Sequence, residues 1–235
     1  MPHPPDVLVV TAMPREAKAL RALGAVACGT RAAAGCTLDA LLRARPPAAV
    51  VITGVCGGLD PSLRPGDAIL ASALLASGRP DLAPGAALLD AARSALRSGA
   101  VRFVTSPVLT VDAPLTPRPA RTGAWNAYGA VAVDMETYDL AAAASARGAP
   151  WLALRVVLDP THHELPPSLR AWSGETDRQV ALRALGRPLE WPAYLRLALQ
   201  WRIAAASLRR AAPIVTRAAS AAAPGGEPRQ AATAP

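Results

Sequence analysis

The sequence predicts a three-layer α/β domain, in which helices cover both faces of a central sheet. Several short apolar runs contain almost no polar residue, as in Ala48-Ala-Val-Val-Ile-Thr53, and such runs are typical of strands buried on both faces. Segments with the apolar spacing of helices separate these runs. Hydrophobic residues make up 51% of the 235 residues, which is enough to build one sizeable core.

The strands are expected in six apolar runs. Arg64-Pro65-Gly66-Asp67 has proline and then glycine at the two central positions of a type II turn, so a strand is expected directly after it. The six strands are expected at residues 6–11, 48–53, 68–70, 101–105, 131–134 and 151–157.

The helices are expected in the segments between and after these runs. Pro14 and Pro84 suit the first turn of a helix, where the missing N–H has no intrahelical partner. The five helices are expected at residues 14–23, 84–98, 136–147, 175–185 and 191–212.

The character of the chain changes after Pro160, where a polar, proline-rich loop begins. We therefore expect a catalytic domain at residues 1–165 and a C-terminal helical extension at residues 166–212. From residue 213 onward alanine, proline, glycine and serine dominate, and no apolar period persists. The sequence predicts a disordered tail at residues 213–235.

The net charge of +8 is concentrated in the C-terminal third. Residues 165–235 carry ten basic and four acidic side chains, and such a segment could face nucleic acid, an anionic membrane surface or solvent. Aromatic residues are only 4% of the chain, too few to suggest a platform for stacking bases. No apolar run is long enough to span a membrane, and residues 1–10 lack the basic start of a signal peptide. Three cysteines without a CxxC pair favour a reduced, cytoplasmic compartment.

Three acidic residues, Glu16, Glu136 and Asp159, follow the ends of predicted strands. Ligands of open α/β sheets bind beyond the carboxyl ends of strands, so one crevice could hold all three carboxylates. The alternative is structural, because acidic residues are favoured in the first turn of a helix, as at Glu16 and Glu136. Asp159 would then merely lead into a loop.

Two further motifs are weak by themselves. The glycine loop Gly54-Val-Cys-Gly-Gly58 is neither a dinucleotide-binding nor a Walker motif, and it indicates a close backbone approach to a ligand or a turn. His162-His163-Glu164 lacks the spacing of a zinc-binding helix, so we expect a solvated loop and no metal site.

The order of the motifs is more specific than any one of them. The run Gly54 to Asp67, then Asp134-Met-Glu136, then Arg155 to Asp159 resembles the purine nucleoside phosphorylase and nucleosidase superfamily over residues 6–160. Within it, Thr11 to Glu16 is similar to the methylthioadenosine nucleosidases. The segments Asp159-Pro160, 165–169 and 191–199 resemble the hopanoid-associated phosphorylases.

The resemblance implies a mixed central sheet and a role for each carboxylate. Asp159 matches the general acid that protonates N7 of the leaving purine, which lowers the barrier to cleavage of the N-glycosidic bond. Glu136 matches the acceptor of the ribose hydroxyls, and Met135 matches the residue that packs on the sugar. Glu16 matches the residue that orients and deprotonates the attacking water.

Other positions match the substrate pocket but depart from the family pattern. Val55 and Gly57 belong to the glycine loop, where relatives commonly have a serine or threonine in place of Val55. Because Val55 offers no ligand for phosphate, we favour hydrolysis, with inorganic phosphate as a co-substrate in the alternative and no other cofactor. The segment containing Asp112, Pro114 and Leu115 is expected to line the base pocket, with Pro114 in place of a stacking aromatic residue.

The resemblance therefore implies an enzyme that cleaves adenine from a 5'-substituted adenosine. Adenosylhopane is the favoured substrate, giving ribosyl- or phosphoribosyl-hopane in hopanoid biosynthesis. The alternatives are a soluble methylthioadenosine/adenosylhomocysteine nucleosidase and a non-catalytic nucleotide- or nucleic-acid-binding protein.

The resemblance also implies a homo-oligomer, and we expect a cytoplasmic protein that does not bind nucleic acid. The arginine-rich helix within residues 190–212 suggests peripheral contact with the inner face of the membrane. Alternatively, this helix simply covers a core.

Overall fold

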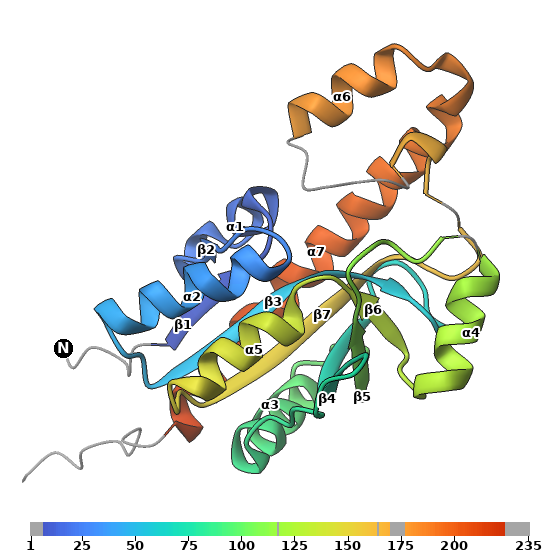
Figure 1. The fold of residues 1–235 in the computed structure, drawn as a ribbon. Helices are drawn as coiled ribbons and strands as arrows, with labels where there is room; N and C mark the ends of the chain where they lie inside the picture. Colours follow the sequence, from blue (N-terminus) through green and yellow to red (C-terminus); the bar gives the residue numbers. More distant parts are fainter. Residues whose placement is uncertain (1–6, 117, 164, 170–176, 224–235) are drawn as a thin grey trace, which may run out of the picture.

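The computed structural model describes residues 7–223 except 117, 164 and 170–176. A mixed sheet of seven strands is covered by helices on both faces, so the predicted fold class is confirmed (Figure 1). The strands are β1 (Val7–Thr11), β2 (Val26–Ala27), β3 (Ala49–Gly58), β4 (Ala68–Ala76), β5 (Phe103–Thr110), β6 (Ala132–Asp134) and β7 (Trp151–Asp159).

The helices account for most of the remaining described chain. The α-helices are α1 (Pro14–Ala19), α2 (Ala32–Ala44), α3 (Ala86–Ser98), α4 (Arg118–Tyr128), α5 (Thr137–Ala146), α6 (Asp177–Leu185) and α7 (Trp191–Ala222). Three short 3-10 helices are η1 (Arg21–Leu23), η2 (Pro167–Leu169) and η3 (Pro188–Glu190).

The ten-residue strand β3 organises the sheet. It pairs in parallel with β1 and β7, and its last two residues, Gly57 and Gly58, pair antiparallel with β6. Because β5 and β4 complete the path from β6 back to β7, five of the strands close on themselves. The β3–β7 register shifts between Cys56 and Gly57. Such irregularities bend a strand and re-aim its side chains, and this one lies where the carboxyl ends of β3 and β7 meet.

Two large cores lie on the two faces of the sheet. Successive residues of a strand point to opposite faces, so Val51 packs in the core under α3 and α7 while Val50 packs under α2 and α5. This arrangement explains why the central strands are apolar throughout. It also leaves the ends of the strands as the only places where β3 and β7 can present side chains to a ligand.

Three elements were not predicted from the sequence: β2, α2 and α4. Alanine and glycine dominate the start of α2, so the sequence shows no clear apolar periodicity there. In the structure, Leu38 and Leu42 of this helix are buried against the sheet. Gly35 lets α2 approach α5 closely, because a Cβ atom there would lie 3.0 Å from the Asp139 carbonyl oxygen. Helix α4 was not predicted because it contains Pro119 and Gly123, two residues with low helix propensity.

Helix α7 corrects the expectation of a disordered tail from residue 213. The helix continues through Pro213 to Ala222, and only residues 224–235 of that expected tail lie outside the described part of the chain. Proline removes one backbone donor from a helix interior, but the buried residues Leu208, Val215 and Ala219 anchor the helix on the sheet face beside α3. Helix α7 is therefore a layer of the main core rather than an appended extension.

Within the described helices, including α7 with its 32 residues, none is long and apolar enough to cross a membrane.

The position of α7 in the core predicts its effect on stability. Replacing the fully buried Leu208 by alanine is expected to lower the free energy of unfolding by about 3 kcal/mol, because it removes apolar contacts and leaves a cavity. The matched control Leu199→Ala, on the exposed side of the same helix, is expected to change it by less than about 0.5 kcal/mol. Urea unfolding followed by circular dichroism and tryptophan fluorescence measures both. Separate transitions for α7 and the sheet would contradict a shared core.

Candidate active site

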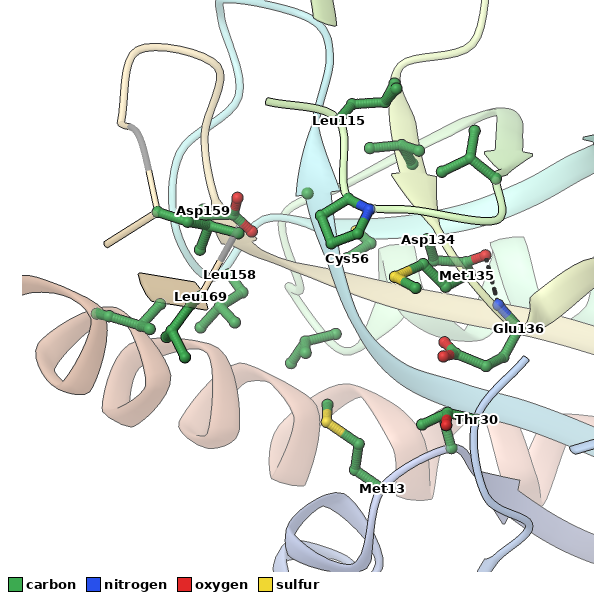
Figure 2. A pocket seen from close by; sticks show the side chains of 18 of the residues that line it. Met13, Thr30, Cys56, Leu115, Asp134, Met135, Glu136, Leu158, Asp159 and Leu169 are labelled. Atoms are coloured by element: carbon green, nitrogen blue, oxygen red, sulfur yellow. Dashed lines mark hydrogen bonds between the residues drawn. The ribbon is translucent and has the colours of Figure 1, made fainter. Parts of the chain in front are cut away.

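A cavity of about 640 Å³ lies at the carboxyl ends of β1, β3, β5, β6 and β7, as predicted for a ligand site of this fold class (Figure 2). Seven of the nine residues expected at the site line it. They are Val55, Gly57, Pro114, Leu115, Met135, Glu136 and Asp159. In Figure 2 the carboxylates of Asp159 and Glu136 lie apart across the cavity, with Met135 between them in this view.

Asp112 does not line the cavity, contrary to the expectation for its segment. The backbone N–H of the preceding residue, Val111, donates to the Asp134 carbonyl oxygen at 2.9 Å and continues the strand pairing beyond β5. Side chains alternate along such an extended segment. Val111 faces the cavity, and Asp112 is exposed to solvent.

Glu16 lies just behind the cavity lining and is fully buried. Its Oε1 accepts the backbone N–H of Val55 at 2.8 Å, and its Oε2 accepts the backbone N–H of Met13 at 2.9 Å. Met13 and Val55 both line the cavity. The Glu16 carboxylate therefore joins the start of α1 to the end of β3, directly under the site.

Arg155 is the buried cation beside this carboxylate, and it was not predicted as a site residue. Its side chain is 1% exposed, and its Nε lies 3.0 Å from Oδ2 of Asp134 in an ion pair. A Cβ atom on Gly54 would lie 2.7 Å from Glu16 Oε1 and 2.8 Å from Arg155 Nη1, which explains the glycine at this position. One signal was available in the sequence, since a lone charged residue in an apolar strand needs a buried partner.

Asp134 holds the turn from β6 into α5. Its carboxylate accepts hydrogen bonds from the Thr110 hydroxyl at 2.8 Å, from the backbone N–H groups of Glu136 and Thr137 at 3.3 and 3.2 Å, and from the Thr137 hydroxyl. This set of contacts fixes the backbone on both sides of Met135. Met135 and Glu136 are thereby presented to the cavity.

Glu136 is a carboxyl group that changes protonation near neutral pH. Burial is the main cause that raises its pKa to about 7, and the neighbouring charge of Asp134 raises it further. Arg155 opposes the rise. Both protonation states of Glu136 are therefore populated near pH 7.

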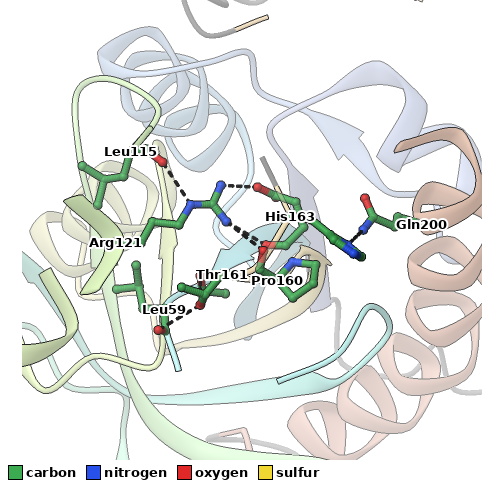
Figure 3. A network of polar contacts seen from close by, with 9 residues as sticks. Leu59, Leu115, Arg121, Pro160, Thr161, His163 and Gln200 are labelled. Carbon is green, nitrogen blue, oxygen red and sulfur yellow. Dashed lines mark hydrogen bonds and ion pairs between the residues drawn. The ribbon is translucent and has the colours of Figure 1, made fainter. Parts of the chain in front are cut away.

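Asp159 forms a buried ion pair with Arg121 of α4, a residue that was not predicted. The side chains are 9% and 5% exposed. Figure 3 shows the Arg121 side chain and its hydrogen bond to Leu115. Arg121 also donates from Nη1 to the Asp159 carbonyl oxygen and from Nε to the Leu115 carbonyl oxygen, each at 3.0 Å. Burial raises the pKa of Asp159 above its ordinary value, and the Arg121 charge holds back that rise.

Cys56 and His163 are two other side chains near the site that could act as a nucleophile or a metal ligand. Burial raises the pKa of the Cys56 thiol in the cavity wall, so this thiol stays protonated and weakly nucleophilic. The Nδ1 atom of His163 contacts the side-chain amide of Gln200. Glu164, the third residue of the His-His-Glu motif, lies outside the described residues. Among the described residues, no group of three His, Cys, Asp or Glu side chains is arranged to hold a metal ion.

Solved structures with the same fold include nucleosidases and a futalosine hydrolase. The chain matches the 5'-methylthioadenosine/S-adenosylhomocysteine nucleosidase of Neisseria meningitidis with a TM-score of 0.68 and 16% identity, over 89% of this chain and 97% of that one. The corresponding nucleosidase of Campylobacter jejuni matches with a TM-score of 0.69 and 14% identity, over 91% and 97%. The futalosine hydrolase of Helicobacter pylori matches with a TM-score of 0.60 and 15% identity, over 65% and 87%.

The sequence itself matches one family model. A search of curated proteins finds no match. The model of the Phosphorylase superfamily matches residues 7–187, which include every part of the cavity lining except Leu197 of α7. This match confirms the expectation of an enzyme in the nucleoside phosphorylase and nucleosidase class. Because the match spans well over half of the sequence, the chain belongs to the Phosphorylase superfamily.

Proposed function

We propose that the enzyme hydrolyses the N-glycosidic bond of a 5'-substituted adenosine and releases adenine. The observation that carries the proposal is a single cavity whose lining includes Glu136 and Asp159, two buried carboxyl groups with a raised pKa, beside the buried Asp134. Two carboxyl groups in different environments allow one to act as an acid and the other as a hydrogen-bond acceptor.

Asp159 is the proposed general acid. A purine leaves more easily once N7 is protonated, so the acid must hold a proton at the working pH. Burial of Asp159 favours the neutral form, which is the form that can donate. Arg121 orients the carboxyl group and limits the rise of its pKa, so that the proton can still be transferred.

Glu136 and Met135 are the proposed ribose contacts. A carboxylate accepts hydrogen bonds from two neighbouring hydroxyl groups, as the sugar requires. The ionised form of Glu136 also favours the positive charge that develops on the ribosyl group as the bond breaks. Met135 supplies an apolar surface for the sugar next to it.

Glu16 is the proposed base for the attacking water. Its two oxygens each accept one backbone N–H, and a carboxylate has about four acceptor sites, so each oxygen can accept one more hydrogen bond. Within the described part of the chain, Nη1 of the buried Arg155 has no hydrogen-bond partner, and a water molecule would provide one. Val55 offers no ligand for phosphate beside them. These features favour water over phosphate as the nucleophile, and the proposed reaction uses no cofactor.

The proposed substrate is adenosylhopane, with ribosyl-hopane as the second product. One part of the cavity lining is purely apolar and suits an apolar 5'-substituent. It consists of Leu158, Leu165, Leu169, Val180 and Leu197, which come from the end of β7, the loop before η2, η2 itself, α6 and α7. A soluble methylthioadenosine/adenosylhomocysteine nucleosidase is the second candidate, favoured by the full-length likeness to such nucleosidases.

The proposed chemistry is tested by adenine release from detergent-solubilised adenosylhopane and from methylthioadenosine, each with and without phosphate. We expect release from adenosylhopane without phosphate. Asp159→Asn is expected to lower kcat/KM by about 10²–10⁴-fold, because the amide cannot donate the required proton. The matched control Asp112→Asn is expected to retain full activity, since Asp112 lies outside the cavity.

The outcomes of this assay test the substrate, the nucleophile and the cleavage reaction separately. Turnover of methylthioadenosine alone would make the enzyme a salvage nucleosidase. Strict dependence on phosphate would replace hydrolysis by phosphorolysis. Absence of adenine from both substrates, with folded protein, would contradict the proposed chemistry.

The acid side of the pH profile is expected to follow Glu136. The proposed role needs the carboxylate, so kcat/KM should fall as the pH drops below about 7, by about tenfold per pH unit. Glu136→Gln cannot be protonated in this range, and it should lower the maximum and remove this limb of the profile. An unchanged acid limb in Glu136→Gln would assign the titration to another group.

The alkaline side is expected to follow Asp159 and to depend on Arg121. Replacing Arg121 by methionine removes the cation that lowers the Asp159 pKa, so the alkaline limb of kcat/KM should move to higher pH. Arg121→Lys keeps the charge and should leave the limb near its original position. Equal shifts in the two variants would show that Arg121 acts only through packing.

A further inference from the structure

Helices α6 and α7, with the short helix η3 between them, carry an unusual concentration of exposed, large apolar side chains. Leu189 is 97% exposed, Leu185 is 70% exposed and Leu195 is 66% exposed. Water-soluble chains rarely expose large contiguous apolar patches without a partner. The outer surface formed by these elements, here called the α6–α7 face, includes Leu182, Leu185, Leu189, Trp191, Leu195 and Leu199.

The exposed residues belong to the N-terminal half of α7 and to the segment before it. From Ala204 onward α7 is anchored in the main core, through Ala204, Leu208, Val215 and Ala219. The first half extends away from the sheet together with α6 (Figure 1). The Trp191 indole N–H donates to the Ala184 carbonyl oxygen at 2.8 Å, and this bond ties the two helices together. The α6–α7 face is thus held in place by the helix that forms part of the core.

Arginine side chains flank this apolar surface. At about 100° per residue, Leu195 and Leu199 form a ridge along α7, with Arg202 on one side and Arg196 on the other. All four side chains are exposed. Helix α7 contains five arginines and no acidic residue. An apolar ridge between cations is the pattern of a helix that lies in the interface of an anionic membrane.

We propose that the α6–α7 face docks on an anionic phospholipid bilayer. The leucines and Trp191 enter the boundary between headgroups and acyl chains, and Arg196 and Arg202 remain at the phosphates. A second copy of the chain fits this face less well. A twofold interface places the same patch on both sides, so the arginines of one copy would lie against those of the other without acidic partners.

The α6–α7 face adjoins the cavity. Leu197 lines the cavity from α7 between the exposed Leu195 and Leu199, and Val180 lines it from α6. The same two helices therefore face the cavity on one side and the proposed bilayer on the other. Resting on the proposed function, this arrangement places the apolar part of the cavity one helix away from the membrane surface, where a lipid-linked 5'-substituent resides.

Vesicle binding of the full chain tests the docking without any nucleoside, so its result is independent of the proposed reaction. Vesicles of phosphatidylcholine are compared with vesicles that also contain phosphatidylglycerol, at low and high salt. We expect sedimentation with the anionic vesicles, weakened by salt. Leu195→Glu/Leu199→Glu is expected to weaken binding at least about tenfold, because two apolar contacts become charged.

The control is Val104→Glu/Tyr128→Glu, which makes the same charge change at two exposed apolar residues outside the face. It should bind as the unmodified chain does. Circular dichroism establishes that both variants are folded, and light scattering gives their mass. Equal vesicle binding by the two variants, or no binding by the unmodified chain, would overturn the proposal. A dimer that Leu195→Glu/Leu199→Glu converts to a monomer, without vesicle binding, would assign the face to a second copy.

Discussion

The buried guanidinium of Arg155 is the charge on which the geometry of the site depends. It forms an ion pair with Asp134 and lies beside Glu16, and all three side chains are buried. Asp134 fixes the turn into α5, and Glu16 joins Met13 to Val55. One cation therefore compensates the two carboxylates that hold three separate chain segments around the cavity. Removing it would leave those carboxylates buried without compensation, which costs about 3–5 kcal/mol for a buried pair.

Two carboxyl groups in the cavity lining, Glu136 and Asp159, have a pKa raised by burial. Glu136 lies close to Asp134, so a like charge adds to the effect of burial, while Arg155 only partly offsets both. Asp159 has its own cation, Arg121, yet burial still dominates its pKa. Burial and neighbouring charges thus act differently on these two carboxyl groups. The site therefore combines the buried contacts of Arg155, Asp134 and Glu16 with two carboxyl groups, Glu136 and Asp159, whose pKa is raised.

The strands other than β2, and the candidate carboxylates, could be predicted because both depend on local patterns. A strand buried on two faces must be apolar. A ligand can reach polar side chains only at the ends of such strands, where Glu136 and Asp159 lie. Arg121 could not be predicted, since α4 contains Pro119 and Gly123 and its contact with Asp159 joins segments 38 residues apart. Asp112 was misassigned because strand pairing continues past β5 and sets its orientation. The full length of α7 was not predicted because most of its buried residues are alanines, which pack in the core but give only a weak apolar periodicity in the sequence.

Helix α7 shows how one element can serve both stability and recognition. From Ala204 onward it packs small residues such as Ala204 and Ala219 against the sheet, where close approach of the backbone compensates for the small side chains. Its first half places Leu197 in the cavity lining and leaves Leu195 and Leu199 exposed. Because a helix is stiff over this length, anchoring one half fixes the position of the other. An apolar surface can therefore stay exposed beside the cavity without collapsing into the core, and whatever binds that surface is held at a fixed orientation to the site.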